Sequence, residues 1–102
     1  MYLVVSEVYP NNAAKEVANL YVKAITKYPH NNSLAAPIVP AALRTTLQGI
    51  ESLSVYEIKK GKAEDAVNYV STRLCMFNDI PGYRWTTNLY VNLEEGLKLT
   101  GV

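Results

Sequence analysis

The chain has 102 residues, of which 49% are apolar and 19% are charged, and its formal net charge is +1. A chain of this length predicts one globular domain, residues 1–102, with one modest core. Lysines and arginines are spread along the chain, which argues against a nucleic-acid or membrane surface that works by bulk charge. A single cysteine excludes an internal disulfide and a multi-cysteine metal site.

The N-terminal residues do not resemble a secretory leader. No apolar run approaches the roughly 20 residues that span a bilayer. A lone thiol also suits a reducing compartment. We therefore expect a cytoplasmic protein.

The first half of the chain predicts a strand, a helix and a second strand. Tyr2–Tyr9 has apolar residues in both alternating sets, which favours a central strand. Over Ala13–Tyr28, apolar residues recur at the helical spacing i, i+3, i+4, i+7, and Pro29 marks the end of the helix. The second strand is expected over Ile38–Leu47. Its prolines cannot donate to a strand ladder, so it belongs at an edge of the sheet.

The second half repeats this order of elements. Gln48–Gly49 predicts a tight turn, and Ile50–Lys59 predicts the returning strand. Gly61–Asp79 carries a compact apolar stripe and is expected to be the second helix. A Pro-Gly turn opens the last strand, Ile80–Asn92, which is rich in aromatic and β-branched residues.

A short helix is expected to close the chain, with Asn92 and Glu95 as a capping box and Gly101 at its end. The resulting order predicts an α+β protein with the ferredoxin-like βαββαβ fold. Its antiparallel four-stranded sheet would have the strand order 4-1-3-2. The proline-containing strand would then lie at one edge and Tyr2–Tyr9 at the centre.

In this fold both helices cover one face of the sheet and leave the other face open. We expect Leu53, Val55, Leu89 and Val91 to point to the helices. The open face would then carry Arg44, Thr46, Ser52, Ser54, Tyr56, Arg84, Thr86, Asn88 and Tyr90. Such a face meets either water or a second copy. The last strand has no charge after its arginine, so its edge is poorly protected against strand addition.

The order of elements, with an extended fourth strand and a C-terminal helix, resembles the dimeric α+β barrel superfamily. The segment Val39–Lys62, VPAALRTTLQGIESLSVYEIKKGK, is similar to the centre of a family of small uncharacterised proteins within it. Members of the superfamily pack two ferredoxin-like sheets face to face. The resemblance therefore implies a homodimer or higher oligomer, and it supplies no activity.

The expected open face also supplies the candidate ligand-binding residues, which are Arg44, Tyr56, Arg84 and Tyr90. Guanidinium groups pair bidentately with carboxylate or phosphate, and tyrosine hydroxyls fix orientation. We therefore expect a small anionic molecule between paired sheets. Alternatively, the arginines pair with glutamates such as Glu7 or Glu57 at the subunit interface. Trp85, Thr86 and Asn88 are expected at that interface.

The single histidine and the single cysteine are weaker candidates for a functional site. His30 stands in the polar segment PHNNS and is expected to be a solvated loop residue, without a partner for nucleophilic catalysis. Cys75 lies away from the apolar stripe of its helix and is expected to be structural or merely exposed. Motifs for RNA, metal or nucleotide binding are absent, so no metal and no cofactor are predicted.

Three functions remain open on the sequence. The first is an uncharacterised oligomeric ferredoxin-like domain that binds a small anionic ligand between sheets. The second is a cofactor-independent oxygenase or isomerase of the dimeric α+β barrel type, with Arg44, Tyr56 and Arg84 holding the substrate. The third is a pure assembly module. Catalytic residues are not assigned in any of the three.

Overall fold

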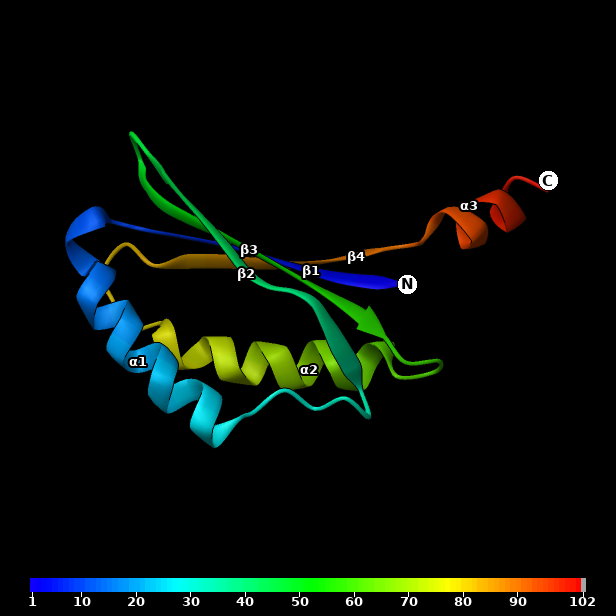
Figure 1. The fold of residues 1–102 in the computed structure, drawn as a ribbon, viewed down its shortest axis with the longest axis horizontal. Helices are drawn as coiled ribbons and strands as arrows, with labels where there is room; N and C mark the ends of the chain where they lie inside the picture. The colour runs from blue at the N-terminus through cyan, green and yellow to red at the C-terminus, as the bar shows by residue number, and fades with distance from the viewer. Residues whose placement is uncertain (102) are drawn as a thin grey trace.

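The computed structural model describes residues 1–101 and contains a four-stranded antiparallel sheet with two helices on one side (Figure 1). The strands are β1 Tyr2–Tyr9, β2 Ala35–Thr46, β3 Gly49–Ile58 and β4 Arg84–Tyr90. The helices are α1 Ala14–Lys27, α2 Ala63–Leu74 and α3 Leu93–Leu99, with 3-10 segments η1 Asn11–Ala13 and η2 Cys75–Phe77. The order across the sheet is β2-β3-β1-β4. The predicted α+β class and antiparallel four-stranded sheet are confirmed.

β2 is an irregular edge strand, as its prolines indicate. It begins at Ala35, three residues before the predicted start, and pairs only with β3. Its register with β3 shifts between Pro37 and Val39, and again between Val39 and Ala42. A proline supplies no N–H to the ladder, so the strand continues past each one by bulging.

β4 is shorter than the predicted strand Ile80–Asn92, because its first residues form a turn. The Tyr83 amide donates to the Ile80 carbonyl at 3.1 Å, and Gly82 has φ +80°. Proline at the second position and glycine at the third are typical of a type II turn. Ile80 and Tyr83 are both buried, so these apolar residues belong to the core and not to the strand.

The core consists of two clusters of buried side chains. The first, here called the α2 cluster, contains Leu3, Val5, Ala35, Tyr56, Ile58, Ala66, Val70 and Leu74. The second, the α1 cluster, contains Tyr9, Ala13, Val17, Ala24, Phe77, Ile80 and Tyr83. Trp85 is half-buried and packs against both clusters. The predicted interface residue Trp85 therefore faces the helices and not the open side of the sheet.

The predicted faces of β3 are wrong. Three residues assigned to the open face are buried instead, namely Ser52, Ser54 and Tyr56. Tyr56 pairs directly with Leu3 of β1, which is fully buried, and residues opposite each other across two strands share a face. Leu53, which was expected to be inward, lies on the open face. The C-terminal end of β3 determines which face of the strand is buried, because Tyr56 and Ile58 pack in the α2 cluster.

The C-terminal helix projects from the body of the molecule. α3 lies beyond the end of the sheet, on the side away from α1 and α2 (Figure 1). None of its residues is buried, and Leu93 and Leu99 are 79% and 78% exposed. The radius of gyration is 14.8 Å, against about 13 Å for a compact domain of this size. None of the helices within residues 1–101 has the length and apolarity needed to cross a membrane.

Candidate functional site

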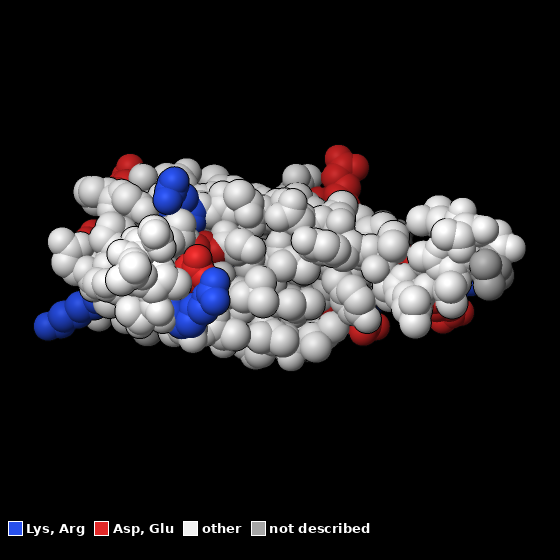
Figure 2. All heavy atoms as spheres, turned by 90° about the horizontal axis from the view of Figure 1, so that it is seen from above, with Lys and Arg blue, Asp and Glu red and all other residues white. Residues whose placement is uncertain are grey.

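The open face of the sheet is largely uncharged in its middle. Figure 2 looks onto the face that α1 and α2 do not cover, and most of its charged atoms lie at one end or on the rim. Direct pairing places Val55 and Asn88 opposite Val4, and Leu53 and Thr86 opposite Ser6. Apolar and small polar side chains therefore make up the centre of the face.

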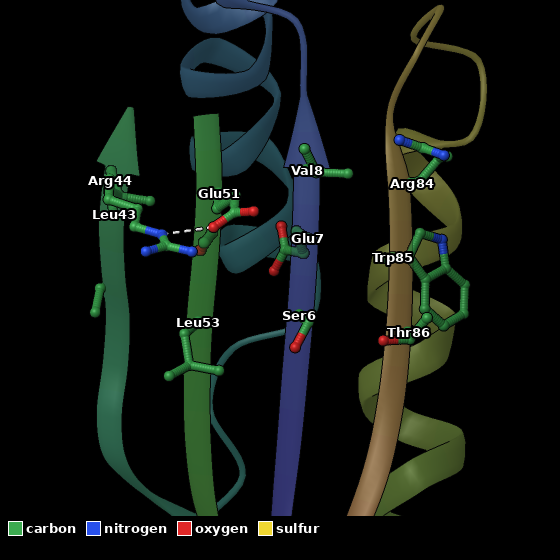
Figure 3. A pocket seen from close by; sticks show the side chains of 12 residues that line it. Ser6, Glu7, Val8, Leu43, Arg44, Glu51, Leu53, Arg84, Trp85 and Thr86 are labelled. Carbon is green, nitrogen blue, oxygen red and sulfur yellow. Dashed lines mark hydrogen bonds and ion pairs between the residues drawn. The ribbon is translucent and has the colours of Figure 1, made fainter. Parts of the chain in front are cut away.

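A cleft of about 660 Å³ extends from the middle of this face to its charged end (Figure 3). Arg44 and Arg84 both line it, but they come from β2 and β4, the two edge strands. Two strands lie between them, so their backbones are separated by about 14 Å. Arg44 Nε donates to Glu51 Oε1 at 2.6 Å, so within one copy its partner is Glu51. A small molecule cannot easily contact both arginines of one copy.

The other predicted ligand-binding residues lie elsewhere. Tyr90 is on the open face but pairs with Tyr2, six residues along β1 from the partner of Arg84, a distance of about 20 Å. Tyr56 is on the opposite face. Thr86 and Asn88 do lie on the open face, whereas the Trp85 indole donates to Asn78 Oδ1 at 2.9 Å. The structure thus brings Arg44 and Arg84 to one cleft and separates them from both tyrosines.

A second cavity lies beneath α1, where the sequence did not indicate a site. Its volume is about 420 Å³, and its lining includes residues of both core clusters. The buried polar or charged side chains among residues 1–101 are Ser52, Ser54 and Arg73, and all three line this cavity. Figure 1 shows α1 running at an angle to the sheet instead of lying flat on it.

Arg73 is a buried charged residue in the lining of this cavity. The residue is 6% exposed, its Nη1 donates to the Tyr28 carbonyl at 2.9 Å, and its Nη2 donates to the Tyr56 hydroxyl at 2.8 Å. The ion pairs within residues 1–101 do not include Arg73. A buried guanidinium with only neutral partners is an unusual arrangement, because such a charge is normally paired.

Glu7 lines the same cavity from β1. The Tyr83 hydroxyl donates a hydrogen bond to its carboxylate. Burial raises the pKa of the Glu7 carboxyl, and the hydrogen bond from Tyr83 and the charge of Arg73 oppose this only in part. Burial and the neighbouring Glu7 charge likewise raise the pKa of Tyr83. Perturbed titrations of this kind cluster at functional sites.

His30 is not the solvated residue that its loop predicted. It is half-buried, its ring lies 5.8 Å from that of Tyr56, and its buried Nδ1 has no hydrogen-bond partner among residues 1–101. Burial, followed by the charge of Arg73, lowers the pKa of His30, so the ring is neutral at pH 7. Cys75 is exposed, as expected. Across residues 1–101, His, Cys, Asp and Glu side chains do not gather into a metal-binding group of three or more.

The sequence did contain a signal for Arg73 and Glu7. Arg73 follows Ala66 by seven residues and Val70 by three, which places it on the buried stripe of α2. Glu7 shares the parity of Leu3 and Val5 along β1 and therefore points inward. A charged residue within a buried stripe indicates a site, because an unpaired buried charge is costly.

Comparison with known proteins gives a likeness of fold alone. No protein-family model matches the chain, and no curated protein matches it. One similar solved structure is a formyltetrahydrofolate deformylase from Pseudomonas putida KT2440, with 3% sequence identity and a TM-score of 0.50. The likeness covers 87% of this chain and 28% of the deformylase chain. At this identity the two chains share an arrangement of helices and strands, and nothing further follows for activity.

Proposed function

We propose that this protein is a homo-oligomeric ferredoxin-like module, in which the open sheet face of one copy packs against that of a second. The observation that carries the proposal is an uncovered face whose middle holds apolar and small polar side chains and is largely uncharged. Leu53 is 43% exposed at its centre, and its side chain points away from both helices. Exposed apolar patches of a few hundred Å² are typical of interaction sites.

The size of the face argues that α3 takes part in the interface. Four strands of about eight residues present roughly 20 Å by 25 Å, or about 500 Å². A standard stable interface buries about 800 Å² on each partner. α3 lies beyond the end of the sheet, on the side of the open face (Figure 1). Its residues Leu93, Leu97 and Leu99 are exposed. Leucines from α3 supply the missing area when they pack on the partner.

The test is the solution mass of the wild-type protein and of Leu53→Lys, by analytical ultracentrifugation at micromolar concentration. We expect a dimer or higher oligomer that Leu53→Lys converts to monomer, because the change places a charge in the apolar interface. Val22→Lys is the matched control, since Val22 is 63% exposed on α1, on the other side of the sheet. A monomeric wild type, or a Leu53→Lys protein with unchanged mass, would refute the proposal.

The cleft at the charged end favours a second function, the binding of a small anion between paired sheets. Arg44 and Arg84 both line the cleft, and Arg84 is exposed without an ion pair among residues 1–101. Pairing of two copies would provide arginines from both sheets. Thermal shifts with phosphate and with citrate test this, and the shift should disappear in Arg84→Ala. An equal shift in wild type and Arg84→Ala would exclude the cleft as the anion site.

A further inference from the structure

We propose that the cavity beneath α1 binds a small apolar monocarboxylate, with its carboxylate on Arg73 and its hydrocarbon part against α1. This site lies within one copy, on the face of the sheet opposite the open one. It lies across the sheet from the Arg44–Arg84 cleft, although Glu7, Leu43 and Ser52 line both. Three features carry it: a buried cation that has no anionic partner among residues 1–101, a buried histidine nitrogen that has no hydrogen-bond partner in the same range, and an apolar wall.

Arg73 has the donors that a carboxylate requires. A guanidinium offers five N–H donors, and the protein accepts from one on Nη1 and one on Nη2. Neither acceptor carries a charge, because one is the Tyr28 carbonyl and the other the Tyr56 hydroxyl. A monocarboxylate would neutralise the buried charge and add charge-assisted hydrogen bonds, which are about twice as strong as neutral ones.

Neighbouring groups complete a polar floor. His30 Nδ1 is buried and finds no hydrogen-bond partner in the described part of the chain, and His30 lines the cavity next to Tyr56. A neutral imidazole can donate from this nitrogen to a carboxylate oxygen. Ser52 and Ser54 of β3 also line the cavity, and Ser54 already donates to the Pro40 carbonyl at 2.8 Å. Arg73, Tyr56 and His30 thus form one polar end of the cavity, whereas Ser52 lies four residues, about 13 Å, along β3 from Tyr56.

The opposite side of the cavity is apolar, which selects the rest of the ligand. Its wall is formed by Ala14, Val17, Ala18, Tyr21 and Val22 of α1, together with Leu43 of β2. Small residues occur on both sides of the space, because Ala14 and Ala18 of α1 and Ser52 and Ser54 of β3 are all among its lining residues. A volume of about 420 Å³ falls within the roughly 300–1,000 Å³ of ordinary small-molecule sites.

Glu7 limits the ligand to a single negative charge. Its carboxylate already accepts from Tyr83, and no ion pair joins it to Arg73 among residues 1–101. Glu7 therefore does not replace the missing partner of Arg73. It repels a second negative charge, so a dicarboxylate or a phosphate should bind less well than a monocarboxylate.

The test is calorimetric titration of the full chain with hexanoate and with 3-phenylpropanoate. The matched uncharged probes are hexanamide and 3-phenylpropanamide, and succinate tests the single-charge limit. We expect both monocarboxylates to bind and each amide to bind about 10-fold to 100-fold more weakly, which is the value of a hydrogen bond to a charged group. Equal binding of acid and amide, or no binding of either acid at millimolar concentration, would overturn the proposal.

Two adjacent residues of α1 provide a matched pair of variants. Ala18 and Asn19 are both exposed, but only Ala18 lines the cavity. Ala18→Leu should fill the cavity and weaken hexanoate binding about 10-fold or more, whereas Asn19→Leu should not change it. Arg44→Ala should also leave binding unchanged. Loss of binding in Arg44→Ala with full binding in Ala18→Leu would place the anion in the open-face cleft and refute this site.

Arg73→Gln tests the charged group itself. Because Arg73 is buried, the Arg73→Gln protein is first compared with wild type by circular dichroism and thermal unfolding. If Arg73→Gln does not fold, hexanoate binding to Ala18→Leu tests the site instead. In a folded Arg73→Gln protein we expect hexanoate and hexanamide to bind equally. A preserved preference for the acid would show that another group holds the carboxylate.

Discussion

Arg73 Nη2 donates a hydrogen bond to the Tyr56 hydroxyl at 2.8 Å and so joins α2 to β3. The same guanidinium holds the end of α1, because its Nη1 donates to the carbonyl of Tyr28. Three elements therefore meet on one buried side chain, at a place where apolar packing leaves a cavity. The hydrogen bonds of Arg73 therefore connect these elements where apolar packing is interrupted by the cavity.

Tyr56→Phe should destabilise the protein by about 1–3 kcal/mol, the cost of leaving a buried donor without an acceptor. Removing one hydroxyl leaves the ring in the α2 cluster, so packing is little changed. Urea unfolding at pH 7 measures the loss. Tyr90→Phe is the control, because Tyr90 is 55% exposed. The free energy of unfolding of this variant should equal that of wild type within error. Equal stability of the two variants would show that the Arg73–Tyr56 bond contributes nothing.

The positions of most elements could be predicted from the sequence. β1 has the expected bounds, and the capping box of α3 is present between Asn92 and Glu95. These features are local: alternation, helical spacing and caps are fixed by residues close in the chain. The register of β2 was less predictable, since its bulges depend on how each proline meets β3.

The faces of the sheet could not be predicted as reliably, and the site depended on them. Leu53 and Val55 alternate with Ser52 and Ser54, which favoured an inward Leu53. The opposite face is buried because Tyr56 packs there against α2, a contact between residues far apart in the chain. One wrong parity moves every side chain of a strand to the other face. The wrong assignment of the faces of β3 therefore grouped Tyr56 with the open-face arginines instead of with Arg73.

Gly49→Ala should destabilise the protein more than Gly61→Ala does. Both glycines have positive φ, +137° and +75°, which costs another residue about 1–2 kcal/mol. A Cβ at Gly49 would also collide with the backbone oxygen of Tyr9, whereas a Cβ at Gly61 would meet nothing within 4 Å. Thermal unfolding of the two variants separates the steric cost from the backbone cost. Equal losses would mean that the β2–β3 turn can move away from β1 without penalty.

Glu7→Gln should raise stability at neutral pH. Because burial raises the pKa of Glu7 in the folded protein, the folded state favours the protonated form. That stabilisation is complete below the unfolded pKa of 4.5 and is lost as the pH rises through the folded value. Glutamine imitates the protonated form and still accepts from Tyr83. The variant should therefore exceed wild type at pH 7 and approach it at pH 4.

Urea midpoints of wild type and Glu7→Gln at both pH values measure this effect. His30, whose pKa burial lowers, is common to both proteins and cancels in the comparison. Glu57→Gln is the control, since Glu57 is exposed on the same sheet. A stability difference that does not change between pH 4 and pH 7 would contradict the expected protonation of Glu7.

Asn92→Ala should unfold α3 without lowering the global stability. Asn92 Oδ1 accepts from the Glu95 amide at 2.8 Å, and loss of such a cap costs about 1 kcal/mol. A seven-residue helix has little stability of its own, and none of the residues of α3 is buried. Amide hydrogen exchange should accelerate within Leu93–Leu99 and stay unchanged in β1, with Asn32→Ala as a control that removes an exposed amide. Because α3 is part of the proposed interface, Asn92→Ala should also weaken self-association. Wild-type exchange rates in α3 would show instead that the ion pair between the Met1 amino group and Glu95 holds this helix without the cap.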